Sequence, residues 1–385
     1  MRRSGVLGLG IACAWAVVAQ HVDAAPGVSF GPSTSVAAPT LVNGFGFFSG
    51  LASDGEGWLV AYNSDLPGAT LLRQIGADGK VTGGPTFAHS TRTNAFRLAH
   101  DGVSYIGAWQ DNSAAPPTWH LGRFGADGSR LGEIGAFDGA SKYVDDVALE
   151  GGEQSALAVA CGYSGCSTRI ITANGFVEGD SLPASQRVSA AYSDGTWLVV
   201  TGTETGLLLS QLGGDGTLIE GTPTTVDGPL GAQAIGTSNG FALTWRQDNK
   251  IRLATVDFDG AISLIPSDIP APLGTWGTPW LRSFNGKNCL FASYYDGSQV
   301  VQVMQRLSAT FERVGDIVLN VPPAAMFAVS NGSSIFGVDT TASPLNGATL
   351  QFGDDITASA PQPLSARPQT QGHLLGSPAP QGWLV

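Results

Sequence analysis

Residues 53–62 read SDGEGWLVAY, and residues 100–109 read HDGVSYIGAW. Each stretch opens on an Asp-Gly turn and continues, three residues after the glycine, with an aromatic residue that starts an apolar strand. Asp-Gly readily provides the positive backbone φ that tight hairpin turns require. The two stretches therefore predict a β-hairpin that occurs more than once in the chain.

The same unit recurs at regular spacing along most of the sequence. The turn glycines lie 44 to 49 residues apart, at Gly55, Gly102, Gly151, Gly195, Gly240, Gly286 and Gly332. The copy at Gly151 is degenerate, because no Asp or Asn precedes it. In the first five repeats a second Asp-Gly or Asn-Gly turn follows after 20 to 26 residues. Two hairpin turns make four strands, and a four-stranded unit of about 45 residues has the size of one propeller blade.

These repeats resemble those of the exported tandem-repeat propeller proteins of bacteria. Their units read D-G-x-x-[WY]-L-V-x-W, followed by a variable loop and a strand that ends in D-G. The resemblance covers residues 40–357 and implies a fold only, because proteins of this kind share no single activity. We therefore predict an all-β chain with a single β-propeller of seven four-stranded blades over residues 40–357, with eight blades as the alternative.

The segments outside the repeats carry predictions of their own. Residues 1–24 combine two arginines, an apolar stretch and small residues before a cleavage point after Ala24, which predicts a signal peptide. We expect residues 25–39 to add an outermost strand to the last blade and so close the ring. Residues 358–385 form a tail rich in Pro and Gln, whose end QGWLV matches EGWLV at 56–60. That tail is either a truncated eighth repeat or a chance echo.

Charge and hydropathy exclude some classes of function. The net charge is −12, and no cluster of Lys and Arg follows the first three residues. Nucleic acids and anionic membranes bind basic surfaces, so we expect neither as a partner. No segment after the predicted signal peptide has 18 consecutive apolar residues, so we expect no membrane span in the mature chain. We predict a monomer that is secreted, periplasmic or held at the cell surface.

Three cysteines follow the predicted signal peptide. Cys161 and Cys166 bracket a short Gly-Tyr-Ser-Gly segment, where the two sides of a hairpin come close enough for a bridge. Because an exported chain meets an oxidising compartment, we predict a disulfide between them. Cys289 lies in an apolar stretch, so we expect it to be buried as a small hydrophobic residue.

The candidate binding residues lie in the long loops. If the strands are lettered A to D from the centre outward, the Asp-Gly turns join A to B and C to D on one face of the disc. The longer, more variable B–C and D–A connections lie on the other face, where loops on a rigid scaffold carry function. Their aromatic, acidic, amide and arginine side chains are suited to sugars or a protein partner. The predicted ligand-binding residues are Asp65, Arg92, Asp111, Asn112, Arg246, Asp248, Trp276, Trp280, Tyr294 and Asp296.

The sequence favours binding over catalysis. No nucleophile with an activating His, no phosphate loop and no metal-ligand spacing is present, so we expect no cofactor and no metal. The favoured function is an exported binding or adhesion module that recognises a glycan or an extracellular protein through the loop-rich face. One alternative is a polysaccharide hydrolase or lyase, and another is a structural cell-surface protein without a specific ligand.

Overall fold

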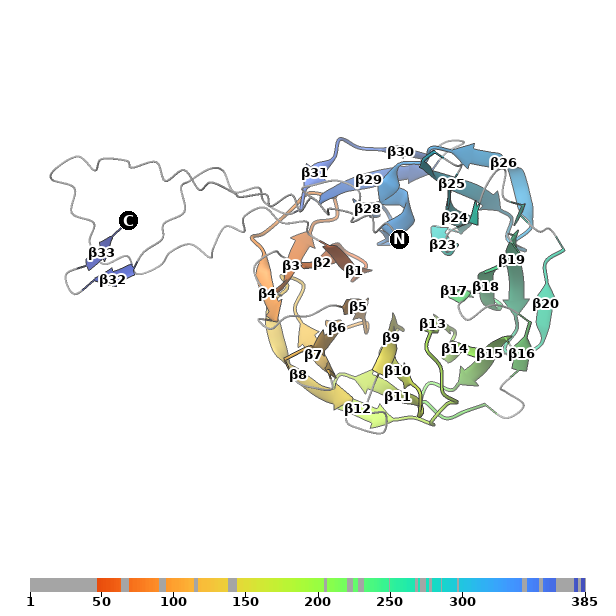
Figure 1. The fold of residues 1–385 in the computed structure, drawn as a ribbon, viewed down its shortest axis with the longest axis horizontal. Coiled ribbons are helices and arrows are strands. Elements are labelled where there is room, and N and C mark those ends of the chain that lie inside the picture. Colours follow the sequence, from red (N-terminus) through yellow and green to blue (C-terminus); the bar gives the residue numbers. More distant parts are fainter. Residues whose placement is uncertain are drawn as a thin grey trace, which may run out of the picture. The chain divides into compact units, whose positions relative to one another are not determined.

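The computed structural model of the protein is a ring of β-sheets (Figure 1) that surrounds a central channel. It describes residues 47–364, with two short stretches at 377–379 and 382–384. The gaps within the first range are 64–68, 90–94, 114–116, 138–143, 204–205, 220–223, 228–231, 249, 267–268, 271–274, 277–278, 285, 296–297, 341–344 and 353–355. Seven antiparallel sheets of four or five strands make up the ring, which confirms the prediction of a seven-bladed propeller.

Each blade runs outward from the channel in chain order, apart from small additions at blades 5, 6 and 7. The innermost strands are β1 (Phe47–Ser53), β5 (Phe96–His100), β9 (Val144–Gly151), β13 (Val188–Ser193), β17 (Ala232–Thr237), β23 (Trp280–Phe284) and β27 (Ala328–Ser330). The second strands are β2 (Trp58–Asn63), β6 (Tyr105–Asp111), β10 (Ala156–Gly162), β14 (Thr196–Thr203), β18 (Gly240–Gln247), β24 (Lys287–Tyr295) and β28 (Ile335–Asp339).

The third strands are β3 (Thr70–Ile75), β7 (Thr118–Phe124), β11 (Gly165–Thr172), β15 (Gly206–Leu212), β19 (Lys250–Val256), β25 (Val300–Leu307) and β29 (Asn346–Phe352). The outer strands are β4 (Thr86–His89), β8 (Arg130–Phe137), β12 (Gly175–Glu178), β16 (Thr224–Val226), β20 (Ile262–Leu264), β26 (Arg313–Leu319) and β30 (Ile356–Ala358). The additional elements are β21 (Ile269–Pro270), β22 (Thr275–Trp276), the 3-10 helix η1 (Pro323–Phe327), β31 (Gln362–Pro363) and the hairpin of β32 (Ser377–Ala379) with β33 (Gly382–Leu384).

The hairpin turns form for the reason that the sequence suggests. In blade 1 the carboxylate of Asp54 accepts hydrogen bonds from the backbone N–H of Glu56 and Gly57 at 2.9 and 2.7 Å. Gly55, which follows Asp54, has a φ of 89°, which a residue with a Cβ adopts only with strain. Asp101 and Asn331 make the same kind of turn in blades 2 and 7.

Two of the described turns depart from the sequence pattern, one in blade 3 and one in blade 6. Neither Gly151 nor Gly152 is in the positive-φ region, so the degenerate copy in blade 3 uses another turn geometry. Blade 6 lacks an Asp-Gly motif between its third and fourth strands. Phe311 takes the left-handed position there with a φ of 63°, and its side chain is buried in the core. Burial of that ring offsets the backbone strain, so the turn carries no Gly signal.

The core lies between neighbouring blades. Trp58, Trp109, Trp197 and Trp245, all on second strands, are almost fully buried. Alternate side chains of each second strand pack against the blade on one side or the other, which is why these strands read as continuous apolar runs.

The ring closes where blade 7 meets blade 1. The indole N–H of Trp58 donates to the carbonyl of Val329 at 2.8 Å, and Nε of Arg73 donates to the carbonyl of Leu364 at 3.0 Å. All described strands of blade 7 come from its own repeat, with β30 and β31 both paired to β29. The predicted closing strand at 25–39 and the signal peptide at 1–24 lie outside the described residues, so both stay predictions. The reading of 358–385 as a truncated repeat also stays untested.

Candidate ligand-binding channel

A cavity of about 1320 Å³ occupies the centre of the ring. Residues of the innermost strands of all seven blades line it, together with parts of the adjoining loops and second strands. Each inner strand starts at the face of the long loops and ends at the face of the Asp-Gly turns. A residue's position along its strand therefore gives its depth in the channel.

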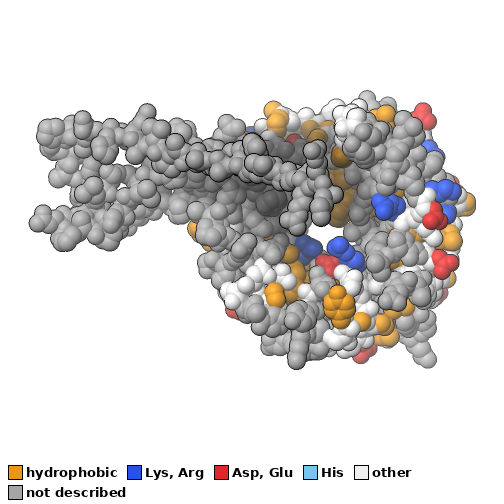
Figure 2. Space-filling model, viewed as in Figure 1, with side chains coloured by type: hydrophobic (Ala, Val, Ile, Leu, Met, Phe, Trp, Pro, Cys, Tyr) orange, Lys and Arg blue, Asp and Glu red, His pale blue; other side chains and the backbone are white. Residues whose placement is uncertain are grey.

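The lining of the channel is basic although the chain as a whole is acidic. Among the described lining residues are four arginines and two carboxylates, Arg97, Arg187, Arg246, Arg282, Asp146 and Glu150. Figure 2 shows basic and acidic side chains around the central opening. The chain holds 19 Lys and Arg against 31 Asp and Glu, so this excess of arginine is local to the channel.

Three of the arginines lie at the end of the channel near the long loops, which we call the loop-face mouth. Arg97 is the second residue of β5, Arg187 directly precedes β13, and Arg246 is next to last in β18. Arg97 Nη2 lies 3.4 Å from the carboxylate of Asp146, at the start of β9. The Arg97 side chain is 43% exposed and lines the channel, so this ion pair contributes little to stability.

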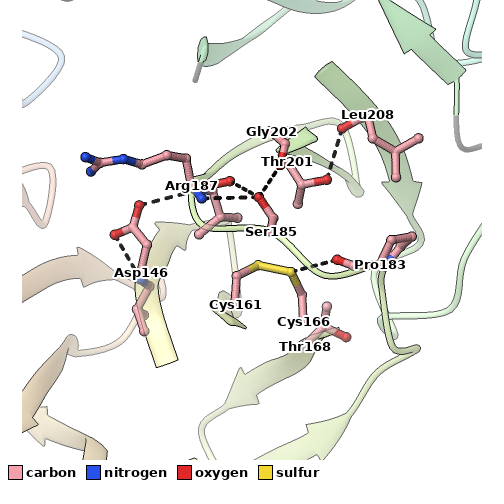
Figure 3. The surroundings of a disulfide bond; sticks show 12 residues. Asp146, Cys161, Cys166, Thr168, Pro183, Ser185, Arg187, Thr201, Gly202 and Leu208 are labelled. Carbon is pink, nitrogen blue, oxygen red and sulfur yellow. Dashed lines mark hydrogen bonds between the residues drawn. A yellow bond between two sulfur atoms is a disulfide. The ribbon is translucent and has the colours of Figure 1, made fainter. Parts of the chain in front are cut away.

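The disulfide of blade 3 helps to position the mouth (Figure 3). Cys161 and Cys166 are paired across the β10–β11 hairpin and bonded, as predicted. The backbone of Cys166 exchanges two hydrogen bonds of 2.9 Å with Leu182, in the connection to blade 4. Further along that connection, the backbone N–H of Arg187 donates to Oγ of Ser185 at 3.2 Å.

The same connection then reaches the acidic residue of the mouth. The backbone N–H of Val188 lies 3.4 Å from Oδ2 of Asp146, and the N–H of Val147 donates to Oδ1 at 3.0 Å. Figure 3 shows the side chains of Asp146 and Arg187 on the same side of this segment. Asp146 is thus held by backbone donors and by Arg97, while the Arg187 side chain extends from an anchored backbone.

The remaining charged pair lies deeper, toward the face of the Asp-Gly turns. Glu150 is next to last in β9, and Arg282 is the third residue of β23. Enclosure by the inner strands desolvates the Glu150 carboxyl and raises its pKa to about 7, against the opposing influence of Arg282. Desolvation likewise lowers the pKa of Arg282, against the attraction of Glu150. The guanidinium carbon of Arg282 lies 5.3 Å from the centre of the Trp280 ring, which packs edge-on against Phe327 at 5.8 Å.

The two carboxylates lie at different depths of the channel. Asp146 and Glu150 are four residues apart on one strand, which separates their backbones by about 13 Å. Acid–base pairs that cleave glycosidic bonds are about 5–10 Å apart.

Of the predicted ligand-binding loop residues that the structure describes, two line the channel, Arg246 and Trp280. Asp111 is the last residue of β6, where it accepts a turn hydrogen bond from Ser113 N–H at 2.8 Å. Asn112 and Asp248 lie in the connections after second strands, and Asp248 has a φ of 48°. Trp276 and Tyr294 are paired through their backbones on β22 and β24, and their side chains are not described. The others lie outside the described residues: Asp65, Arg92 and Asp296. As a set, the ten remain predictions.

The sequence reading did not select Arg97, Asp146, Glu150, Arg187 or Arg282. A usable signal was present, since each is a charged residue within or directly before the first strand of its repeat. The first strand of a blade borders the channel, so a charged side chain on it reaches solvent mainly in the lumen.

Other chemistry has little support in the described part of the chain. Cys289 is buried, and desolvation raises the pKa of its thiol to about 11, which makes it a poor nucleophile at neutral pH. Within the described ranges, no three His, Cys, Asp or Glu residues come together as metal ligands. No helix among the described residues is long and apolar enough to span a membrane.

Comparison with known proteins supports the fold but does not indicate a function. No family model matches the chain, and no curated protein matches it in sequence. A protein from Lactobacillus plantarum superimposes with a TM-score of 0.56 at 12% identity, over 81% of this chain and 97% of that one. The β-propeller domain of the Trilobed protease from Pyrococcus furiosus, described as having an open velcro topology, gives 0.52 at 11% identity, over 82% and 98%.

A putative 6-phosphogluconolactonase from Bacteroides fragilis also gives a TM-score of 0.52, at 12% identity over 79% of this chain and 94% of that one. At such identities the likeness shows the architecture alone. In fold, the chain is a seven-bladed β-propeller.

Proposed function

We propose that the protein is an exported binding module that takes an acidic glycan into the loop-face mouth of its central channel. The observation that carries this proposal is the gathering of arginines on one cavity in a chain of net charge −12. Arginine presents a planar set of donors that matches a carboxylate or sulfate group, and it is more easily desolvated than lysine.

The uncharged lining favours a glycan among anionic ligands. Hydroxyl and amide groups of Ser189, Gln233, Ser283 and Ser330 are spaced around the channel among its aliphatic side chains. Sugars bring hydroxyls that need such partners, and a deep lumen can enclose one strand of a polysaccharide. Export, predicted from residues 1–24, would bring the protein to extracellular glycans, and the Cys161–Cys166 disulfide is consistent with that location.

Isothermal titration with charge-matched oligosaccharides tests the proposal. We expect a galacturonic acid hexamer to bind, a neutral glucose hexamer not to bind, and the affinity to fall between 50 and 200 mM NaCl. Arg187→Ala should weaken binding at least fivefold, because this side chain faces the mouth and its loss breaks no ion pair that holds the fold. Arg313→Ala, on the exposed outer strand β26, is the matched control and should bind as the wild type does.

Three outcomes would overturn the proposal. They are failure of both hexamers to bind, equal binding of the neutral hexamer, and wild-type affinity in the Arg187→Ala variant. Tighter binding of a glutamic acid hexapeptide than of the sugar acid would replace the glycan by an acidic protein segment as the ligand.

A further inference from the structure

The inner half of the channel contains an arginine that is fixed in place but not fully hydrogen-bonded. One terminal nitrogen of Arg282 donates to the carbonyl of Leu281 at 2.8 Å, and the guanidinium lies 5.3 Å from the centre of the Trp280 ring. Its Nε is buried and has no hydrogen-bond partner. A buried N–H of a charged group without a partner is costly, so the fold does not fully satisfy this side chain. Arg282 also lines the cavity, where a ligand acceptor can approach it.

A carboxyl group faces the same space without a partner. Glu150 makes no hydrogen bond or ion pair with any described residue, although it lines the cavity. Its strand β9 belongs to blade 3 and the strand β23 of Arg282 to blade 6, three places apart in the ring (Figure 1). Both residues line the cavity. They affect each other's ionisation across this space but do not form an ion pair.

Two opposite charges that face one cavity without meeting define the chemistry of a complementary ligand. A simple anion would satisfy Arg282 but would meet the charge of Glu150, and a simple cation would have the converse problem. A molecule with a carboxylate and an ammonium group a few bonds apart satisfies both groups at once. We propose that Glu150 and Arg282 form a binding site for a free α-amino acid, with the ligand carboxylate on Arg282 and its ammonium group on Glu150.

This site is separate from the loop-face mouth and does not depend on the glycan proposal. Glu150 lies four residues along β9 from Asp146, or about 13 Å. Among the described residues, the other charged or titratable groups that line the channel are Arg97, Asp146, Arg187, Arg246 and Tyr192. The first four lie toward the mouth. The hydroxyl of Tyr192 accepts a hydrogen bond from the backbone N–H of Gly195 at 3.1 Å.

Matched derivatives of one ligand provide the sharpest test. The twenty common L-amino acids would first be screened by thermal shift at pH 8, and the best binder titrated by calorimetry beside its N-acetyl derivative and its carboxamide. The N-acetyl form lacks the ammonium group and the carboxamide lacks the carboxylate. We expect each derivative to bind at least tenfold more weakly than the free amino acid.

Variants and pH then assign the two groups. Glu150→Gln and Arg282→Gln should each weaken binding at least tenfold, while Glu153→Gln and Arg313→Gln, both exposed, should not change it. Because the pKa of Glu150 is about 7, its ionised fraction rises about tenfold from pH 6 to pH 8, and wild-type affinity should rise with it. Glu150→Gln should show no such rise.

The proposal is overturned if no amino acid binds, if the N-acetyl form binds as tightly as the free amino acid, or if affinity falls as the pH rises. Circular dichroism of each variant shows whether the ring is intact. If Arg282→Gln does not fold, the comparison of derivatives on the wild-type protein still decides the question.

Discussion

Replacing Glu150 by Gln should change how the stability of the ring depends on pH. Desolvation in the channel raises the pKa of this carboxyl from 4.5 to about 7. Below pH 4.5 the group is protonated in both the folded and the unfolded chain. Between pH 4.5 and 7 the unfolded chain releases the proton while the folded chain keeps it, so the free energy of unfolding falls as the pH rises.

The size of the effect follows from the same two pKa values. Each pKa unit of difference corresponds to about 1.4 kcal/mol, which gives a loss of about 2–3 kcal/mol between pH 5 and pH 8. Glutamine resembles the protonated carboxyl in shape and has no charge. The variant should therefore exceed the wild type by about 1 kcal/mol at pH 5 and by about 3 kcal/mol at pH 8.

Urea unfolding at pH 5 and pH 8, followed by tryptophan fluorescence, measures this difference in both proteins. Burial lowers the pKa of His100, which makes stability rise with pH in part of the same range. That contribution is common to the two proteins, so it cancels when their pH dependences are compared. Parallel pH dependences in the wild type and the variant, with equal m-values, would show that Glu150 does not titrate as reasoned.

Three further predictions concern the scaffold. Gly102→Ala should destabilise the ring by several kcal/mol more than Gly55→Ala in chemical denaturation, because both glycines have a φ near 90° but only at position 102 would a Cβ meet a backbone oxygen, at 1.9 Å. A chain that ends at residue 359 should have a free energy of unfolding about 3–5 kcal/mol lower than one that ends at residue 365, and so a lower melting temperature, because it loses the fully buried Leu364 and the carbonyl that closes the ring. Equal melting temperatures would contradict this closure. Replacing Cys161 and Cys166 by Ser should cost about 2 kcal/mol by the loop-entropy model and weaken binding of the galacturonic acid hexamer, and unchanged binding would separate the disulfide from the mouth.

The number of blades was predictable because the turn signal is local. A residue in the left-handed region has few alternatives to Gly, Asn or Asp, so six of the seven first turns carry the signal in the sequence. Phe311 shows where this reasoning fails. A buried ring stabilises the left-handed backbone there, and no local pattern distinguishes that phenylalanine from others in the core.

The channel residues were less predictable because the arrangement of the blades in the ring decides which side chains face the lumen. Arg97 lies in FRLAH and Arg282 in WLRSF, short inner strands whose side chains face a neighbouring blade or the lumen. Which of these a side chain meets depends on the tilt and register of the strand, and neither follows from the alternation of polar and apolar residues alone. The loop residues were easier to select, since polarity in a long connection is visible in the sequence, but polarity there is also what any solvated loop requires.

The contrast between an acidic chain and an arginine-lined channel bears on selectivity. At physiological ionic strength charges are screened over about 8 Å, so an anion outside the ring senses mainly the nearest surface, and only a ligand that enters the channel comes within reach of Arg187 and Arg282. A duplex nucleic acid meets the outside of a chain of net charge −12 first. A single flexible glycan strand or a free amino acid can pass the mouth. If this reasoning holds, raising the salt concentration should weaken binding of the galacturonic acid hexamer in the wild type more than in the Arg187→Ala variant, because fewer charge contacts remain there to be screened.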